Sequence, residues 1–223
     1  MGDTGYRIRI GGSVRDRLLR NPRALRLPTP ALDIFVVRQF LDPAECAALI
    51  ALIDRDRVPS TLLAPTADPD YRTSESCNLA PWEPIVEKVE ARLVHLLDID
   101  PDLGETIQGQ RYAAGQQFKP HHDFFHMSEA YWPEMERTGG QRTWTAMIFL
   151  NTPETGGHTN FPEAGIKVSP VAGNLLAWNN LDSIGEPNPN SLHQGMPVSA
   201  GIKYIVTKWH RERPWIPTDK HLY

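Results

Sequence analysis

Residues 142–179 read RTWTAMIFLNTPETGGHTNFPEAGIKVSPVAGNLLAWN, and this stretch decides the fold class. Short runs of β-branched, aromatic and aliphatic residues alternate with glycine, proline and asparagine, the pattern of strands joined by turns. The stretch predicts four strands, near residues 142–151, 158–161, 165–169 and 173–179. The same texture on either side predicts four more, near residues 107–113, 116–124, 191–197 and 201–210. Short strands at this spacing are typical of a β-sandwich, barrel or jelly roll.

The residues before position 106 carry a helical pattern instead. An apolar run at 32–40 predicts one strand, and Asp42, Pro43 and Glu45 then supply an N-cap, a first-turn proline and a first-turn acid. The helix that begins there has Cys46 on its apolar face, so we expect this cysteine in the core. A second helix is expected over roughly residues 81–97. The fold class is therefore mainly β with N-terminal helices, a double-stranded β-helix (jelly-roll) core with supporting α-helices.

The expected domain organisation follows these changes of pattern. Residues 1–30 are basic and are expected to form an irregular arm, and residues 31–105 a helical support region with the first strands. Residues 106–213 would form the β-helix core and residues 214–223 a tail, with residues 31–223 folding as one domain. The polar segment 127–141 is expected to be an inserted loop with a helical turn.

Composition excludes several classes of function. The chain has 223 residues, 40% of them hydrophobic, which is ordinary for a globular protein with a core. A net charge of −4 gives no electrostatic case for a nucleic-acid partner. The two cysteines lack ligand-like spacing, which argues against a disulfide framework or a thiolate zinc site. Without a membrane-length apolar run or a signal-peptide pattern at its start, the chain is expected to be soluble and cytoplasmic.

The densest chemistry lies at Pro120-His121-His122-Asp123. On a strand, His121 and Asp123 share a face and could hold one ion. Fe(II) enzymes that activate O2 use two histidines and one carboxylate, and His193, before the last expected strand, would be the second histidine. Taken alone, the pair fits a surface turn equally well. His210 and Glu212 have the same spacing, and we interpret residues 210–212 as a solvated tail.

A lysine ten residues after His193 strengthens the site. In the strand 201–209, alternation places Lys203, Ile205, Thr207 and Trp209 on one face. If that face lines the barrel, Lys203 is a buried cation that needs an anion. A dicarboxylate could chelate iron with its keto acid and place its far carboxylate on the lysine. With the strand reversed, Lys203 would be a solvated surface residue, and the strand by itself does not decide between the two. His126 and His158 are expected to be ordinary polar positions.

A series of motifs occurs in order along the chain. They read RYAAGQQFKPHHDF (111–124), GGQR (139–142), IFLN (148–151), GGHTNFP (156–162), VSPVAGNLL (168–176), HQGMPV (193–198) and GIKYIVTKW (201–209). In this order the sequence resembles the catalytic domain of the prolyl 4-hydroxylase alpha-subunit family, in a small bacterial-type or algal-type form. The resemblance is strong over roughly residues 106–213 and looser at residues 71–74.

The resemblance implies an activity, cofactors and roles for individual residues. It implies an Fe(II)- and 2-oxoglutarate-dependent dioxygenase that hydroxylates a prolyl residue in a peptide or protein, consumes O2 and releases succinate and CO2. Ascorbate would act as the reductant. The iron ligands would be His121, Asp123 and His193. Lys203 would bind the C5 carboxylate of 2-oxoglutarate, and Tyr112 and Thr159 would hydrogen-bond that carboxylate or line its pocket. Trp209 and Arg142 would lie on the substrate side.

Three alternatives stay open at this point. Segments 125–136 and 179–190 depart from the family pattern and are expected at the barrel mouth, where substrate is chosen. A free amino acid or small metabolite is therefore an alternative substrate with the same cofactors. A non-catalytic, cupin-like barrel that binds a metal or small acid is an alternative of another class. A zinc hydrolase would use the same ligands but leaves Lys203 without a role. Both a monomer and a homodimer are compatible with the sequence.

Overall fold

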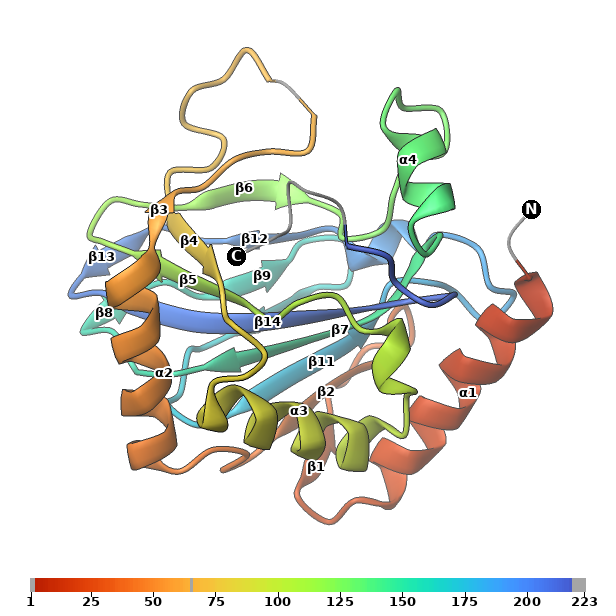
Figure 1. The fold of residues 1–223 in the computed structure, drawn as a ribbon, viewed down its shortest axis with the longest axis horizontal. Coiled ribbons are helices and arrows are strands. Elements are labelled where there is room, and N and C mark those ends of the chain that lie inside the picture. The colour runs from red at the N-terminus through yellow and green to blue at the C-terminus, as the bar shows by residue number, and fades with distance from the viewer. Residues whose placement is uncertain (1–2, 65, 218–223) are drawn as a thin grey trace.

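The computed structural model describes residues 3–64 and 66–217, and it is mainly β (Figure 1). Its helices are α1 (Thr4–Arg20), α2 (Pro43–Asp56), α3 (Pro84–Leu97) and α4 (Trp132–Arg137), with short 3-10 turns η1 (Pro101–Leu103) and η2 (Pro189–Ser191). Its strands are β1 (Ala24–Arg26), β2 (Ile34–Val37), β3 (Val58–Pro59), β4 (Glu75–Asn78), β5 (Gln108–Tyr112), β6 (Phe118–His121), β7 (Arg142–Phe149), β8 (Thr155–Gly156), β9 (Thr159–Phe161), β10 (Ile166–Val168), β11 (Leu175–Asn179), β12 (His193–Gly195), β13 (Val198–Ala200) and β14 (Lys203–Arg211).

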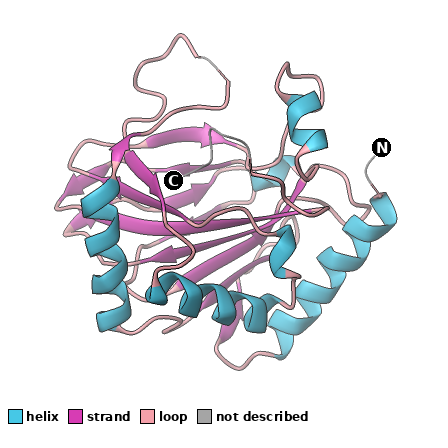
Figure 2. Ribbon diagram, viewed as in Figure 1, coloured by secondary structure: helices cyan, strands magenta, loops and turns pink. Residues whose placement is uncertain are grey.

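The strands form two principal antiparallel sheets. The large sheet has the order β1-β2-β11-β7-β14-β5-β4-β3, and the small sheet the order β10-β9-β12-β6, with β13 and β8 paired separately. Helices α1, α2 and α3 lie along one side of the large sheet (Figure 2). Each of the eight expected strands is present, and α4 is the helical turn expected in the inserted loop. The mainly β class with supporting helices is confirmed.

Alternation along the central strands divides the interior into two cores. Trp144, Ala146 and Ile148 of β7 pack with apolar residues of α1, α2 and α3 on the outer face of the sheet. Met147 and Phe149 face the opposite way and pack with residues of β9, β11 and β14. Because both faces of the large sheet are covered, strands such as β7 and β11 are buried along nearly their whole length.

Helix α2 begins as the sequence predicts. The Asp42 side chain accepts a hydrogen bond from the Glu45 backbone N–H, and the Glu45 side chain accepts one from the Asp42 N–H, so a full capping box is present. Cys46 is buried in the outer core, as expected. Helix α3 carries Val86, Val89 and Leu93 into the same core.

The expectation of an irregular arm over residues 1–30 is wrong for the part that the structure describes. Thr4–Arg20 form α1, which buries Ile10, Val14 and Leu18, and β1 adds a strand to the large sheet. These apolar positions recur every four residues, but the helix also contains several arginines and three glycines, and glycine lowers helix propensity. Packing against the sheet and α3 stabilises the helix in spite of its composition.

The interpretation of residues 210–212 as a solvated tail is also wrong. Strand β14 continues to Arg211, and His210, Arg211 and Glu212 are all buried. Their charges are compensated by residues distant in sequence, since Arg211 pairs with Glu105 and Glu212 with Arg7. A run of charged residues at a strand end predicts exposure only when such partners are missing.

The sequence did not predict the short strands β1, β3, β4, β8 and β13, each of two to four residues. They lie at or next to a sheet edge or in the separate pair, and each is too short to show a pattern. Over the described ranges, no helix combines the length and apolar character needed to cross a membrane.

Candidate metal centre and adjoining pocket

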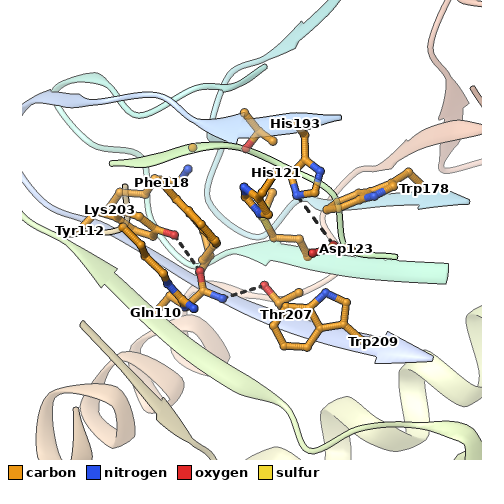
Figure 3. Close-up of a pocket in the computed structure, with 15 residues that line it drawn as sticks. Gln110, Tyr112, Phe118, His121, Asp123, Trp178, His193, Lys203, Thr207 and Trp209 are labelled. Atoms are coloured by element: carbon orange, nitrogen blue, oxygen red, sulfur yellow. Dashed lines mark hydrogen bonds and ion pairs between the residues drawn. The ribbon is translucent and has the colours of Figure 1, made fainter. Parts of the chain in front are cut away.

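The two ligand-bearing segments meet in the small sheet. His121 is the last residue of β6 and His193 the first of β12, and the two are direct partners in the antiparallel register. Asp123 follows β6 by two residues. One ligand atom from each of His121, Asp123 and His193 lies within 4.8 Å of the other two. The expected triad is therefore brought together in space (Figure 3).

Hydrogen bonds set the tautomer of both histidines. His121 Nδ1 lies 2.8 Å from the Lys119 carbonyl oxygen, and His193 Nδ1 lies 2.9 Å from that of Ser191. Since a carbonyl oxygen only accepts, each Nδ1 carries the hydrogen and each Nε2 presents a lone pair. Burial, followed by the neighbouring His193, lowers the pKa of His121 to about 3, so its ring stays neutral. Neutral imidazoles with a fixed Nδ1–H are the form in which histidine binds metals.

Buried polar groups orient the carboxylate. Thr145 donates a hydrogen bond to Asp123 Oδ2 at 2.8 Å, and Asn180 donates to the Thr145 oxygen at 2.9 Å. Trp178 in turn donates to Asn180 Oδ1 at 3.0 Å. Burial opposes ionisation of Asp123, but His193, His121 and Arg142 outweigh it and lower its pKa. The site thus presents two nitrogen lone pairs and one oriented carboxylate, the donor set that suits Fe(II).

Lys203 extends into the pocket beside this triad. Its side chain is buried, with the ammonium 5.3 Å from the Tyr112 ring centre and 5.7 Å from that of Phe149. It forms no hydrogen bond or ion pair with any residue in 3–64 or 66–217. Burial lowers the pKa of Lys203 to about 7. The inward orientation of Lys203, which the sequence left open, is settled by this placement.

A second polar group in the pocket also lacks a partner. The buried hydroxyl of Thr159 makes no hydrogen bond within the described part of the chain. Buried polar groups are normally satisfied, and a buried ammonium requires an anion. The residues therefore fit a ligand carboxylate that lies between Lys203 and Thr159 and reaches toward the triad.

The other candidate residues fall into two groups. Tyr112, Thr159 and Trp209 line the same pocket as His121, Asp123, His193 and Lys203. Arg142 does not line it: Glu105 holds its guanidinium through bonds of 2.6 and 2.7 Å, and it stacks on Trp209 at 4.2 Å. His126 is exposed and His158 half-buried, and neither lines the pocket.

Several pocket residues were not singled out from the sequence. The main ones are Arg72, Gln110, Phe118, Met147, Trp178, Ile205 and Thr207. Strand alternation alone predicts the inward direction of Ile205 and Thr207, because they share a face with Lys203. Arg72 belongs to a loop, and no local pattern relates it to β5 and β6.

Comparison with known proteins gives a consistent result. A sequence model described as "2OG-Fe(II) oxygenase superfamily" matches residues 107–211. A putative prolyl 4-hydroxylase of Acanthamoeba polyphaga mimivirus is 31% identical over 180 residues, covering 80% of this chain and 74% of the relative. Prolyl 4-hydroxylase 1 of Arabidopsis thaliana is 32% identical over 200 residues, covering 81% and 69%.

A similar solved structure extends this agreement to three dimensions. The viral collagen prolyl hydroxylase of Paramecium bursaria Chlorella virus-1, solved as a 2OG complex, superposes with a TM-score of 0.64 at 27% identity. The superposition covers 80% of this chain and 95% of the viral one. The segment that the superfamily model matches contains His121, Asp123, His193 and Lys203.

Proposed function

Since this chain belongs to the prolyl 4-hydroxylase family of 2OG-Fe(II) oxygenases, we propose that it hydroxylates a prolyl residue in a peptide or protein. The observation that carries the proposal is the buried, uncompensated Lys203 beside a His-Asp-His cluster. A metal site alone would fit many functions, whereas a metal site with an adjoining receptor for a carboxylate fits a keto-acid cosubstrate.

The metal would be held by Nε2 of His121, a carboxylate oxygen of Asp123 and Nε2 of His193. Bound Fe(II) would supply the O2-activating chemistry that couples decarboxylation of 2-oxoglutarate, to succinate and CO2, with hydroxylation of the substrate. The Nδ1 hydrogen bonds of both imidazoles leave each Nε2 lone pair for the metal, and Thr145 holds the carboxylate, so the ligand set is in place before the metal arrives.

The cosubstrate would be held through its far carboxylate. Lys203 supplies the positive charge and the Thr159 hydroxyl a hydrogen bond, and both groups lack other partners among the described residues. Because the Lys203 side chain is buried, water does not screen this ion pair, and the attraction is stronger than at a surface. The opposite end of the cosubstrate then reaches the triad in one orientation.

We assign Trp209, which lines the pocket together with the triad, to the substrate side. Two relatives named prolyl 4-hydroxylases support a prolyl substrate for this chain as well. Ascorbate as the reductant is part of the same proposal. It predicts that turnover slows progressively without ascorbate and recovers when ascorbate is added.

The decisive experiment measures succinate release with Fe(II), 2-oxoglutarate and O2, supplied with prolyl peptides or with free amino acids. Peptide-dependent succinate and a hydroxylated prolyl residue by mass spectrometry are expected. His121→Ala and His193→Ala should abolish both signals because each removes one metal ligand. Turnover with free amino acids but not with peptides would show that the substrate is a small molecule and not a peptide. Full activity in either histidine variant would contradict the metal site.

A further inference from the structure

The hydroxyl of Tyr112 forms a hydrogen bond with another side chain of the pocket. Tyr112 is buried, with its ring 5.3 Å from the Lys203 ammonium, so its hydroxyl would be a natural donor to a carboxylate bound there. Its oxygen, however, lies 2.8 Å from Oε1 of Gln110 (Figure 3). An amide oxygen has no hydrogen, so the phenol hydrogen lies between these two atoms.

Arg72, which also lines the pocket, fixes the direction of this hydrogen bond. A guanidinium only donates, and Arg72 Nη2 lies 3.0 Å from the side chain of Gln108. Gln108 must therefore present its amide oxygen to Arg72. The same oxygen lies 3.1 Å from the Gln110 amide nitrogen, which donates to it. Gln110 is left with its own oxygen facing Tyr112.

Reversing either amide would place like groups against each other. A flipped Gln108 would set an NH2 against the Arg72 guanidinium, and a flipped Gln110 would set two amide oxygens 3.1 Å apart. Thr207, 3.5 Å from the Gln110 nitrogen, is a further acceptor for the same orientation. The chain Arg72–Gln108–Gln110–Tyr112 thus has one polarity.

The phenol keeps its hydrogen under ordinary conditions. Burial raises the pKa of Tyr112, and Arg72 and a hydrogen bond from Ser74 oppose this only in part. The Tyr112 hydroxyl therefore donates its one hydrogen to Gln110, which leaves none for a ligand.

From this geometry we infer that Gln110 withholds the Tyr112 hydroxyl hydrogen from the cosubstrate, so that, within residues 3–64 and 66–217, the far carboxylate is held by Lys203 and Thr159. Gln110 is then a positioning residue that lowers the affinity for 2-oxoglutarate, acting through Tyr112. The inference rests on the proposed function, since it takes 2-oxoglutarate as the ligand of this pocket. It departs from the role that family resemblance implies for Tyr112.

The test is a double-mutant cycle on 2-oxoglutarate binding, measured by calorimetry on the Fe(II)-loaded protein without O2. Tyr112→Phe is expected to change Kd less than about twofold, because the lost hydroxyl bonds only to protein. Gln110→Leu frees the hydroxyl and is expected to lower Kd about threefold to tenfold, the range of the net contribution of one typical hydrogen bond. In the Gln110→Leu background, adding Tyr112→Phe should remove that gain.

A spectroscopic readout needs no ligand. In the Raman spectrum, the tyrosine ring doublet responds to whether the hydroxyl donates or accepts. The difference between wild type and Tyr112→Phe should show a strong donor, and the same difference in the Gln110→Leu background should not. Tyr204→Phe is the matched control, since Tyr204 donates to Asp54 on the outer face of the same sheet. It should leave Kd unchanged.

The outcomes separate this inference from the proposed function. If Tyr112→Phe alone raises Kd about tenfold, Tyr112 donates to the ligand and the Gln110 inference is wrong while the proposed function stands. If Gln110→Leu folds but binds no tighter, the inference is equally wrong. Gln110→Met provides a second replacement of similar size if the leucine variant does not fold. If the wild type does not bind 2-oxoglutarate, and Lys203→Met leaves the binding signal unchanged, both the inference and the proposed function are overturned.

Discussion

Lys203 is a cation that has lost its hydration without gaining a counterion within the described chain. The cost of this burial is offset by the rest of the fold until an anion binds. Function and stability are opposed at this residue, as expected where a binding site is prepared in advance.

This conflict predicts a pH dependence for the ligand-free, metal-free protein. Burial lowers the pKa of Lys203 to about 7, against 10.5 in the unfolded chain. Between these values the unfolded state binds more protons, so the contribution of Lys203 to stability improves as pH rises, by about 1.4 kcal/mol per pH unit at most. Lys203→Met should be more stable than wild type at pH 7. Its advantage should shrink toward pH 10.5 in urea titrations, and a constant difference would contradict the linkage.

The hydroxyl that supports Asp123 gives a second prediction at this scale. Thr145→Val removes the 2.8 Å hydrogen bond to Asp123 Oδ2 while keeping the shape of the side chain. We expect Fe(II) affinity to fall about 10- to 100-fold, the usual effect of losing a group that orients a metal ligand. Thr143→Val is the matched control, because Thr143 is equally buried on the same strand but bonds to the His210 carbonyl. Equal losses in both variants would refute a specific role for Thr145.

At the scale of elements, the end of β14 depends on one carboxylate. Glu105, which precedes β5, pairs with both Arg142 and Arg211, two guanidiniums with little exposure. Through Arg142 it also fixes the stack on Trp209 at the edge of the pocket. Removing one partner of a buried ion pair is costly because the other charges remain.

Glu105→Gln is therefore expected to lower the free energy of unfolding by about 3–5 kcal/mol, measured by urea denaturation. The matched control is Glu83→Gln, since Glu83 pairs with the exposed Arg55 at 2.9 Å. A surface pair of this kind contributes less than about 1 kcal/mol. If the two variants lose similar free energies of unfolding, the ion pairs of Glu105 stabilise the fold no more than a surface ion pair does.

Sequence patterns predict the elements that have internal periodicity. Alternation located each long strand and correctly grouped Lys203, Ile205, Thr207 and Trp209 on one face. The position of His193 opposite His121 could not be derived from either segment, because strand pairing is a long-range property. The Gln110 chain was missed for the same reason, since it links a loop residue to β5.

At the scale of the whole molecule, α1 closes the outer core. Its Val14 and Leu18 pack against the same cluster as α3 and β7, and Arg17 donates to the His95 and Leu96 carbonyls at the end of α3. The N-terminal segment, interpreted as an arm because of its charge, is part of the fold. The apolar residues of α1 recur every four positions, but this spacing is recognisable as a helix only once the sheet on which they pack is known.

Leu18→Ala should therefore destabilise the protein by about 2–5 kcal/mol, the usual cost of truncating a buried leucine. Leu19→Ala is the matched control on the next residue, which is 53% exposed. It should change stability by about 0.5 kcal/mol or less. The measurement is the thermal denaturation of both variants. Equal changes in melting temperature would mean that α1 does not pack against the sheet in solution.

The pairing of His121 with His193 has a topological consequence. A metal held by both would join two strands that the chain connects through α4, β7, β8, β9, β10, β11 and η2. It would act as a removable cross-link that closes these elements into one loop. Such a closure reduces the entropy of the unfolded chain, as a disulfide does, but it opens whenever the ion leaves. The integrity of the barrel and its readiness for catalysis would then depend on the same ion.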